Sequence, residues 1–235
     1  MSPSGHHIIK LLGVSAVVLL CILAGRFIWS ATAVLYENTA NKHWKNKRYL
    51  SRKNNFLNIS AVDSCVRLLQ TGDLVVRRGD DMTSYMLSQL NTNDKTYSHC
   101  GIVVEENGYP YVYHSIGGED NPDGIIRRDS AHYWCSPANN LSFAAYRYRI
   151  SDSVKNRFVR YVHGFYREKR MFDMAFDMAT DDRLYCSEMI YKAMLQATGD
   201  TGYINLSENY GRKFAGIDNL YPAAHSRAIC RIRFK

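Results

Sequence analysis

Two short motifs, far apart in the chain, constrain what this sequence can fold into. The first reads YSHCGIV at residues 97–103, and the second reads LYCSEMI at residues 184–190. His99 precedes an apolar, β-branched run of the kind found in buried strands. Cys186 precedes apolar residues at helical spacing, which predicts the start of a helix. We therefore expect a strand that begins near a histidine and a helix that begins at a cysteine.

A cysteine at a helix N-terminus has unusual chemistry. The positive end of the helix dipole and a neighbouring histidine both favour the thiolate, which is the nucleophilic form. Taken alone, Cys186 fits a small buried structural residue better than a nucleophile. The coincidence of a strand start at His99 and a helix start at Cys186 favours a nucleophile with its base.

A second histidine lies one hairpin away from His99. His114 ends the alternating run at residues 109–114, and Asn107-Gly108 lies between the two apolar runs. This pattern predicts a hairpin that brings the two imidazoles side by side. One imidazole then orients the other, and the second ring nitrogen of His99 is left to take the proton of Cys186.

The order of the motifs resembles that of a known enzyme family. GDLVV at 72–76, YSHCGIV at 97–103, FDMAFD at 172–177 and LYCSE at 184–188 are similar to motifs of the YiiX/YebB-like branch of circularly permuted NlpC-type, papain-like hydrolases. The resemblance spans roughly residues 65–233. It implies an α+β fold in which an antiparallel sheet carrying the histidine packs against helices, one of which carries the cysteine.

The same resemblance assigns roles to three residues. It implies Cys186 as the nucleophile, His99 as the general base and His114 as the orienting third member. The backbone N–H of Cys186, helped by Tyr185, is the expected oxyanion donor. Glu188, in the first turn of the expected helix, has a structural interpretation because a carboxylate there suits the helix dipole. No metal and no organic cofactor is needed for this chemistry.

The expected function is therefore that of a membrane-tethered cysteine hydrolase, a thiol peptidase or amidase that cleaves a peptide-like and possibly cell-wall amide bond. Two alternatives stay open. One is a lipid acyl hydrolase or acyltransferase of the lecithin retinol acyltransferase type, and the other is an inactive binding module that keeps only the fold. The expected partner is an amide- or acyl-containing substrate.

The N-terminus has a separate physical character. Residues 8–29 are mainly apolar, with Lys10 and Arg26 near the two ends. This length is close to the roughly 20 residues that span a bilayer. We expect an N-terminal transmembrane helix within residues 1–30, with a cleaved signal peptide as the alternative. A single-pass membrane location follows, with the domain exported to the periplasmic face and the cytoplasmic face left open.

A basic stretch follows the apolar segment. Six Lys or Arg residues and no acidic residue lie between positions 42 and 53, out of a net charge of +8. We expect residues 31–60 to be a juxtamembrane linker that touches anionic lipid. Residues 61–235 form the expected hydrolase domain, which is nearly neutral. Nucleic acid is not an expected partner, because the domain has no basic patch with interleaved aromatic residues.

The remaining expectations concern cysteines and chain order. Five cysteines lie beyond the apolar segment, so four remain for disulfides if Cys186 is free, and the sequence leaves their pairing open. The patterns predict helices at 61–69, 83–90 and 154–165 and one that starts at 186. They predict strands at 73–77, 101–105, 109–114, 143–150 and 229–234.

Overall fold

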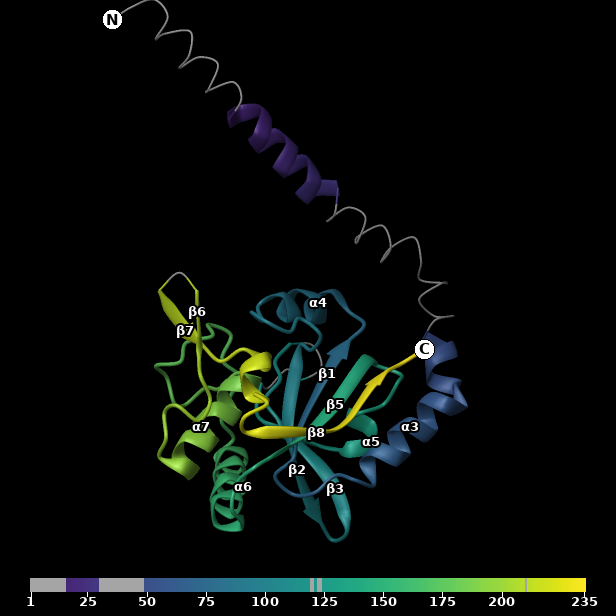
Figure 1. The fold of residues 1–235 in the computed structure, drawn as a ribbon, viewed down its shortest axis with the longest axis vertical. Helices are drawn as coiled ribbons and strands as arrows, with labels where there is room; N and C mark the ends of the chain where they lie inside the picture. Colours follow the sequence, from purple (N-terminus) through teal and green to yellow (C-terminus); the bar gives the residue numbers. More distant parts are fainter. Residues whose placement is uncertain (1–15, 30–48, 119–120, 122–123, 210) are drawn as a thin grey trace, which may run out of the picture. The chain divides into compact units, whose positions relative to one another are not determined.

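The computed structural model describes residues 16–29, 49–118, 121, 124–209 and 211–235. The chain divides into two units, Met1–Leu50 and Ser51–Lys235. A six-stranded sheet forms the centre of the second unit, with its strands in the order β4-β3-β2-β1-β5-β8 (Figure 1). All neighbouring strands run antiparallel. The expected antiparallel sheet packed against helices is therefore confirmed.

The strands of the main sheet match the apolar runs of the sequence. Their bounds are β1 (Leu74–Gly79), β2 (His99–Glu106), β3 (Tyr109–His114), β4 (Arg127–Ser130), β5 (Asn140–Tyr148) and β8 (Ser226–Arg233). Between β2 and β3, Asn107 and Gly108 have φ angles of 53° and 80°. These left-handed values are those of a tight hairpin turn, as the Asn-Gly pair predicts. A small separate sheet pairs β6 (Ser207–Asn209) with β7 (Arg212–Phe214).

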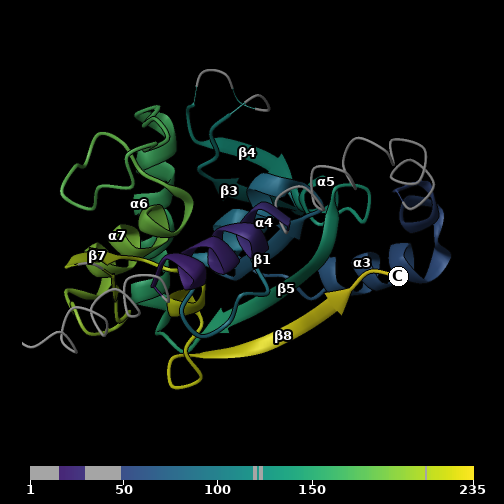
Figure 2. The same ribbon diagram turned by 90° about the horizontal axis from the view of Figure 1, so that it is seen from above.

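Helices cover both faces of the main sheet. On one face, Leu74 and Ile102 belong to the same buried cluster as residues of α6 (Asp152–Arg167) and α7 (Cys186–Thr198). On the other, Val75 and Val103 belong to the cluster that includes residues of α3 (Phe56–Val66) and α5 (Ala131–Trp134). Figure 2 shows the sheet between these two helical layers. Because both faces are buried, the central strands are continuously apolar rather than alternating.

Two helices on the α7 side follow from simple periodicity. Phe158, Val162 and Phe165 form one buried stripe along α6. In α7 the buried set includes Met189, Ile190, Ala193, Met194 and Ala197. Burial of each large apolar side chain contributes about 1.5–3 kcal/mol, which holds α7 and its first residue against the sheet. Two further helices are α4 (Met82–Gln89) and the 3₁₀ helix η1 (Ile217–Leu220).

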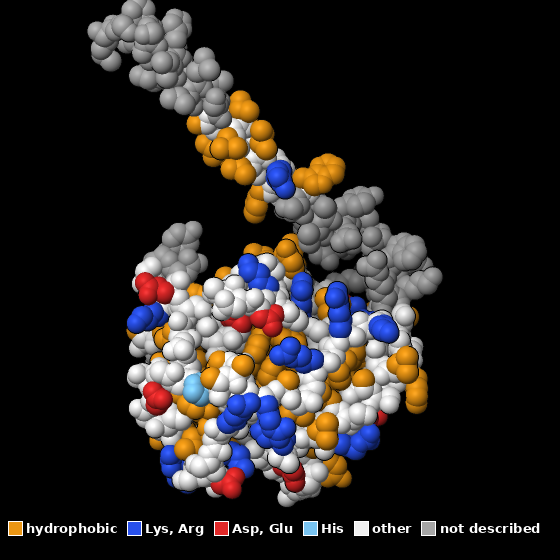
Figure 3. All heavy atoms as spheres, in the orientation of Figure 1, with side chains coloured by type: hydrophobic (Ala, Val, Ile, Leu, Met, Phe, Trp, Pro, Cys, Tyr) orange, Lys and Arg blue, Asp and Glu red, His pale blue; other side chains and the backbone are white. Residues whose placement is uncertain are grey.

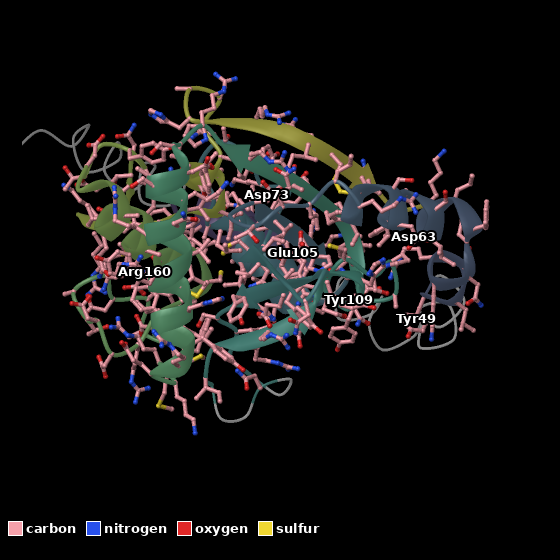
Figure 4. All side chains as sticks on the ribbon, turned by 90° about the horizontal axis from the view of Figure 1, so that it is seen from below. Tyr49, Asp63, Asp73, Glu105, Tyr109 and Arg160 are labelled. Atoms are coloured by element: carbon pink, nitrogen blue, oxygen red, sulfur yellow. A yellow bond between two sulfur atoms is a disulfide. The ribbon has the colours of Figure 1, made fainter. Side chains whose placement is uncertain are left out.

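A disulfide and an ion pair tie the second unit together. Cys65 on α3 is bonded to Cys230 on β8 across 165 residues of sequence (Figure 4). A cross-link over so long a loop stabilises the fold mainly by restricting the unfolded chain. Asp73, labelled in Figure 4, accepts hydrogen bonds from Arg147 Nε and from one terminal nitrogen of Arg147, both at 2.8 Å. This pair joins the start of β1 to β5.

The outer strand β8 carries arginines along its length. Arg227, Arg231 and Arg233 are all exposed. Charged side chains on an edge strand discourage pairing with the edge of another molecule. Figure 3 shows Lys and Arg side chains distributed over the face of the unit on which β8 lies.

The expected N-terminal transmembrane helix is not supported. The described helix in this part of the chain covers residues 16–29, and it includes Arg26. No helix among the described residues is long and apolar enough to cross a membrane. The structure therefore does not support the expected single-pass membrane location.

Other expectations can be compared element by element. Residues 1–15 and 30 of the expected anchor and residues 31–48 of the expected basic linker lie outside the described residues. The predicted helices and strands are all present, although α3 begins at Phe56 rather than at residue 61. β4, α5, β6, β7 and η1 were not predicted. Each is only three or four residues long, which is too short to show a clear period.

Candidate active site

The helix side of the site begins at Cys186, the first residue of α7. Its N-cap is Tyr185, which has an extended backbone. The Glu188 carboxylate accepts a hydrogen bond from the Tyr185 N–H at 3.1 Å. The helix start is therefore closed by a side chain from its own first turn.

Buried charges hold this first turn in place. Glu188 is fully buried, and one of its oxygens lies 3.0 Å from Lys192 Nζ one turn later. Lys192 also contacts the Asp181 carboxylate at 2.7 Å. Burial raises the pKa of Glu188 to about 7, although hydrogen bonding and the charge of Lys192 act in the opposite direction. Glu188 thus stabilises the start of α7 through its contacts with Tyr185 N–H and Lys192.

The sheet side of the site is a row of three polar side chains. His99 begins β2 and His114 ends β3, and the two rings meet with His99 Nε2 at 2.9 Å from His114 Nδ1. The other nitrogen of His114, Nε2, lies 2.9 Å from Oδ2 of Asp129 on β4. Three neighbouring strands therefore contribute one residue each to a continuous hydrogen-bonded chain.

The chemistry of these groups sets the direction of each hydrogen bond. An ionised carboxylate only accepts, so His114 Nε2 carries a hydrogen and donates it to Asp129. The neutral ring of His114 then accepts at Nδ1, where His99 Nε2 is the donor. His99 is left with a lone pair on Nδ1. The row therefore presents one proton-accepting atom at its end.

Close packing keeps the two rings in register. The Trp134 ring is fully buried, with its centroid 5.9 Å from the His99 ring and 6.1 Å from the His114 ring. Opposite His114, position 101 has no room for a side chain. A Cβ on Gly101 would lie 2.4 Å from Val112 Cγ1 and 3.1 Å from His114 Cβ. Glycine at this position lets β2 and β3 approach closely enough for the rings to meet.

Burial keeps both imidazoles neutral. It lowers the pKa of His99 to about 4, and the charges of His114 and Arg77 act in the same direction. It also lowers the pKa of His114 to about 4, although the hydrogen bond to Asp129 opposes this change. For Asp129, burial favours the neutral form, but the hydrogen bond from His114 and the nearby charges hold the pKa below its ordinary value.

The two sides meet at the Cys186 sulfur. Side-chain hydrogen bonds with Cys100 and His99 lower the pKa of the Cys186 thiol well below its ordinary value, despite the opposing effect of burial. Since His99 Nε2 faces His114, Nδ1 is the ring nitrogen left for Cys186. As a whole residue Cys186 is 8% exposed, so it lies at the edge of the buried cluster. The Cys186 sulfur and the His99 imidazole are thus paired.

Tyr185 is the other residue expected at this site, and both its hydroxyl and its backbone N–H bond to other parts of the fold. Its hydroxyl accepts a hydrogen bond from Ala215 N–H and contacts Met178 Sδ, both at 2.9 Å. Its backbone N–H donates to Glu188. The N–H of Cys186 lies in the first turn of α7, where backbone donors have no carbonyl partner within the helix.

The structure brings Cys186, His99 and His114 together, as the motifs predict, and adds Asp129. Sequence reasoning missed this residue because Arg127-Arg128-Asp129-Ser130 is short and polar. The missing information was the register of β4 against β3. Asp129 lies opposite Val112, and Val112 is two residues before His114 on β3. Alternation in a strand puts Val112 and His114 on the same face, which is the face that Asp129 shares.

Comparison with known proteins gives one informative result. No family model and no curated protein matches the chain. Among solved structures, the chain is similar to the crystal structure of metalloprotein yiiX from Escherichia coli O157:H7. The TM-score is 0.56 at 20% sequence identity, and the match covers 70% of this chain and 98% of yiiX. The chain therefore has a YiiX-like fold, and at this identity the likeness extends to the fold alone.

Proposed function

We propose that this protein is a cysteine hydrolase that cleaves an amide bond in a peptide-like substrate. The observation that carries the proposal is the contact of the Cys186 thiol with His99, whose ring is held by His114 and Asp129. A nucleophile, a base and a group that orients the base are the parts that acyl transfer requires. The sequence resemblance to NlpC-type hydrolases supports the same reaction class.

Each group has a defined task in the proposed reaction. His99 Nδ1 takes the proton of the Cys186 thiol as the sulfur attacks the substrate carbonyl. The imidazolium is stabilised through His114 by the negative charge of Asp129. His99 then gives the proton to the leaving amine, and a thioester to Cys186 remains. Water hydrolyses the thioester with His99 again acting as base, which restores the thiol.

The backbone N–H of Cys186 is the proposed donor to the carbonyl oxygen in the tetrahedral intermediate. It belongs to the start of α7, where the helix dipole also favours negative charge. The Tyr185 hydroxyl and N–H have other partners, so we assign Tyr185 the role of shaping the helix start.

The word metalloprotein in the name of yiiX raises the question of a metal in this chain. The described residues contain no group of three or more His, Cys, Asp or Glu side chains placed to hold a metal ion. His114 uses one ring nitrogen for His99 and the other for Asp129, so it has no lone pair free for a metal. The donor set does not fit a metal site, and the proposed reaction uses none.

Labelling with iodoacetamide tests whether Cys186 is a nucleophile. In the native full-length protein at pH 7, we expect Cys186 to react at least about 10-fold faster than in the urea-unfolded chain, because its pKa is lowered. Cys135 is the matched comparison, since it is fully buried and burial raises its pKa to about 12. Equal rates for Cys186 in the native and unfolded protein would contradict the proposal.

Turnover identifies the bond that is cleaved. The full-length protein is incubated with muropeptides, N-acyl amides and ester lipids, and products are followed by mass spectrometry. We expect cleavage of peptide amides by the wild type and by Cys135→Ala, and none by folded Cys186→Ala. Cleavage of the ester lipids alone would replace the proposal with a lipid acyl hydrolase. Turnover of any substrate by Cys186→Ala at the wild-type rate would refute the mechanism.

A further inference from the structure

A second cysteine lies next to the proposed nucleophile. Cys100 follows His99 on β2, and it belongs to the same buried cluster as Cys186. The two residues are near enough for each to shift the pKa of the other, that of Cys186 downward and that of Cys100 upward. The proposed hydrolysis uses His99 but gives the Cys100 thiol no task. A free thiol beside a reactive thiol therefore needs its own account.

The other cysteines of this unit show what is special about this pair. Cys65 and Cys230 are already joined in a disulfide that links α3 to β8. Cys135 is a free, fully buried thiol in the other core cluster, and no cysteine is among the groups that affect its ionisation. Among the free thiols of the described chain, Cys100 and Cys186 are the two that share a buried cluster and shift each other's pKa.

The accessibility of the two thiols is unequal. Cys186 is 8% exposed at a helix start, whereas Cys100 has no exposed surface. A small oxidant therefore meets Cys186 first. Cys100 is placed to react with the oxidised sulfur. This division into a reactive cysteine and an adjacent resolving cysteine is the arrangement found in reversible thiol switches.

We propose that Cys100 and Cys186 form a reversible disulfide under peroxide, which switches the site off and protects its sulfur from irreversible oxidation. This role goes beyond the proposed hydrolysis and does not depend on the substrate. In the disulfide state Cys186 has no free thiol to attack a carbonyl. Reduction by a dithiol restores both side chains by thiol–disulfide exchange.

The chemistry balances with hydrogen peroxide as the oxidant. The Cys186 thiol first loses its proton. The thiolate attacks one peroxide oxygen and the O–O bond breaks. The released hydroxide takes up a proton in place of the one lost and leaves as water. Cys186 is then a sulfenic acid. The Cys100 sulfur attacks the Cys186 sulfur, an S–S bond forms, and the S–OH bond breaks. The proton of Cys100 goes to the departing hydroxide, so two thiols and one peroxide give one disulfide and two waters.

Intact mass and peptide mapping test this switch without any substrate. The starting material is the full-length protein with Cys100 and Cys186 as free thiols and the Cys65–Cys230 disulfide intact. It is treated with a small excess of hydrogen peroxide, alkylated under denaturing conditions and digested. We expect a loss of about 2 Da and a linked pair of peptides that contain Cys100 and Cys186. Dithiothreitol is expected to remove the link. Cys135→Ala is the matched control and is expected to form the same link as the wild type.

Cys100→Ala separates a resolving cysteine from a bystander. Without its partner, Cys186 is expected to gain about 32 Da as the sulfinic acid, which dithiothreitol does not reverse. Cys100→Ser serves if the alanine variant does not fold. Recovery of alkylated Cys100 from the peroxide-treated wild type, with Cys186 overoxidised as fast as in Cys100→Ala, would overturn the proposal. Because these measurements are masses and not turnover, they test the disulfide independently of the hydrolase activity. Either proposal can fail while the other holds.

Discussion

The two sides of the candidate site are held in place by different means. On the sheet side, His99, His114 and Asp129 come from three neighbouring strands and depend on one another through hydrogen bonds of 2.9 Å. On the helix side, Cys186 is placed by the backbone of α7. The charged groups near it, Glu188 and Lys192, satisfy each other within one helical turn.

This difference indicates which side of the site is more sensitive to substitution. A helix start is a local structure, so changes in its polar side chains are expected to leave the Cys186 backbone in place. The histidine row exists only when three strands have the correct register. Loss of one member leaves another buried polar group without its partner, which costs about 1–3 kcal/mol and frees the ring that must face the sulfur.

The largest effect is expected from removing the base on the sheet side. In His99→Gln the Cys186 thiol loses its proton acceptor, so turnover should fall by roughly 10²- to 10⁴-fold. The rate of iodoacetamide labelling of Cys186 at pH 7 should fall as well, because a hydrogen bond that lowers its pKa is lost. Circular dichroism checks the fold. Unchanged labelling and turnover would mean that the two sides act independently.

Asp129→Asn is expected to have the next largest effect. The amide cannot supply the negative charge that stabilises the imidazolium, so turnover should fall by about 10- to 100-fold, a typical cost for a partner group behind a functional side chain. Asp63→Asn is the matched control, because Asp63 forms an exposed pair with His132 at 3.5 Å (Figure 4). If both variants keep full turnover, Asp129 has no part in positioning His114.

The sheet side should also make the protein sensitive to acid. In the folded state the pKa values of His99 and His114 are about 4, against about 6.5 in the unfolded chain. The unfolded chain therefore binds more protons between pH 6.5 and pH 4, and stability is lost as the pH falls through this window. We expect the free energy of unfolding to decrease by roughly 3 kcal/mol for each ring across the whole window.

Urea unfolding at pH 7 and pH 5 measures this loss. His114→Gln removes one of the two titrating rings, so the difference between the two pH values should become smaller in that variant. A wild-type stability that is the same at pH 7 and pH 5 would show that the histidines are not buried as neutral rings.

The smallest effect is expected on the helix side. Glu188→Gln keeps an oxygen that can accept the hydrogen bond from Tyr185 N–H and loses only the charge facing Lys192. We expect a change in stability below about 1 kcal/mol and a change in the labelling rate of Cys186 below about 3-fold. A loss comparable with that of Asp129→Asn would mean that the helix side is as interdependent as the sheet side.

Some features were visible in the sequence because they depend on residues close together in the chain. The hairpin around Asn107-Gly108, the buried strand after His99 and the helix that begins at Cys186 all follow from local period and turn chemistry. The apolar N-terminal run misled the same reasoning. Hydropathy predicted a membrane-spanning helix, whereas no helix among the described residues is long and apolar enough to be one.

The sequence by itself determined the position of Cys186 and the expectation that His99 and His114 share a hairpin, because helix starts and hairpins are set by neighbouring residues. Only the tertiary structure decided that Asp129 completes the histidine row, that Cys65 pairs with Cys230, and that Cys100 lies beside Cys186. These contacts join elements far apart in the chain, and strand register and helix packing fix such distances, which no local pattern encodes.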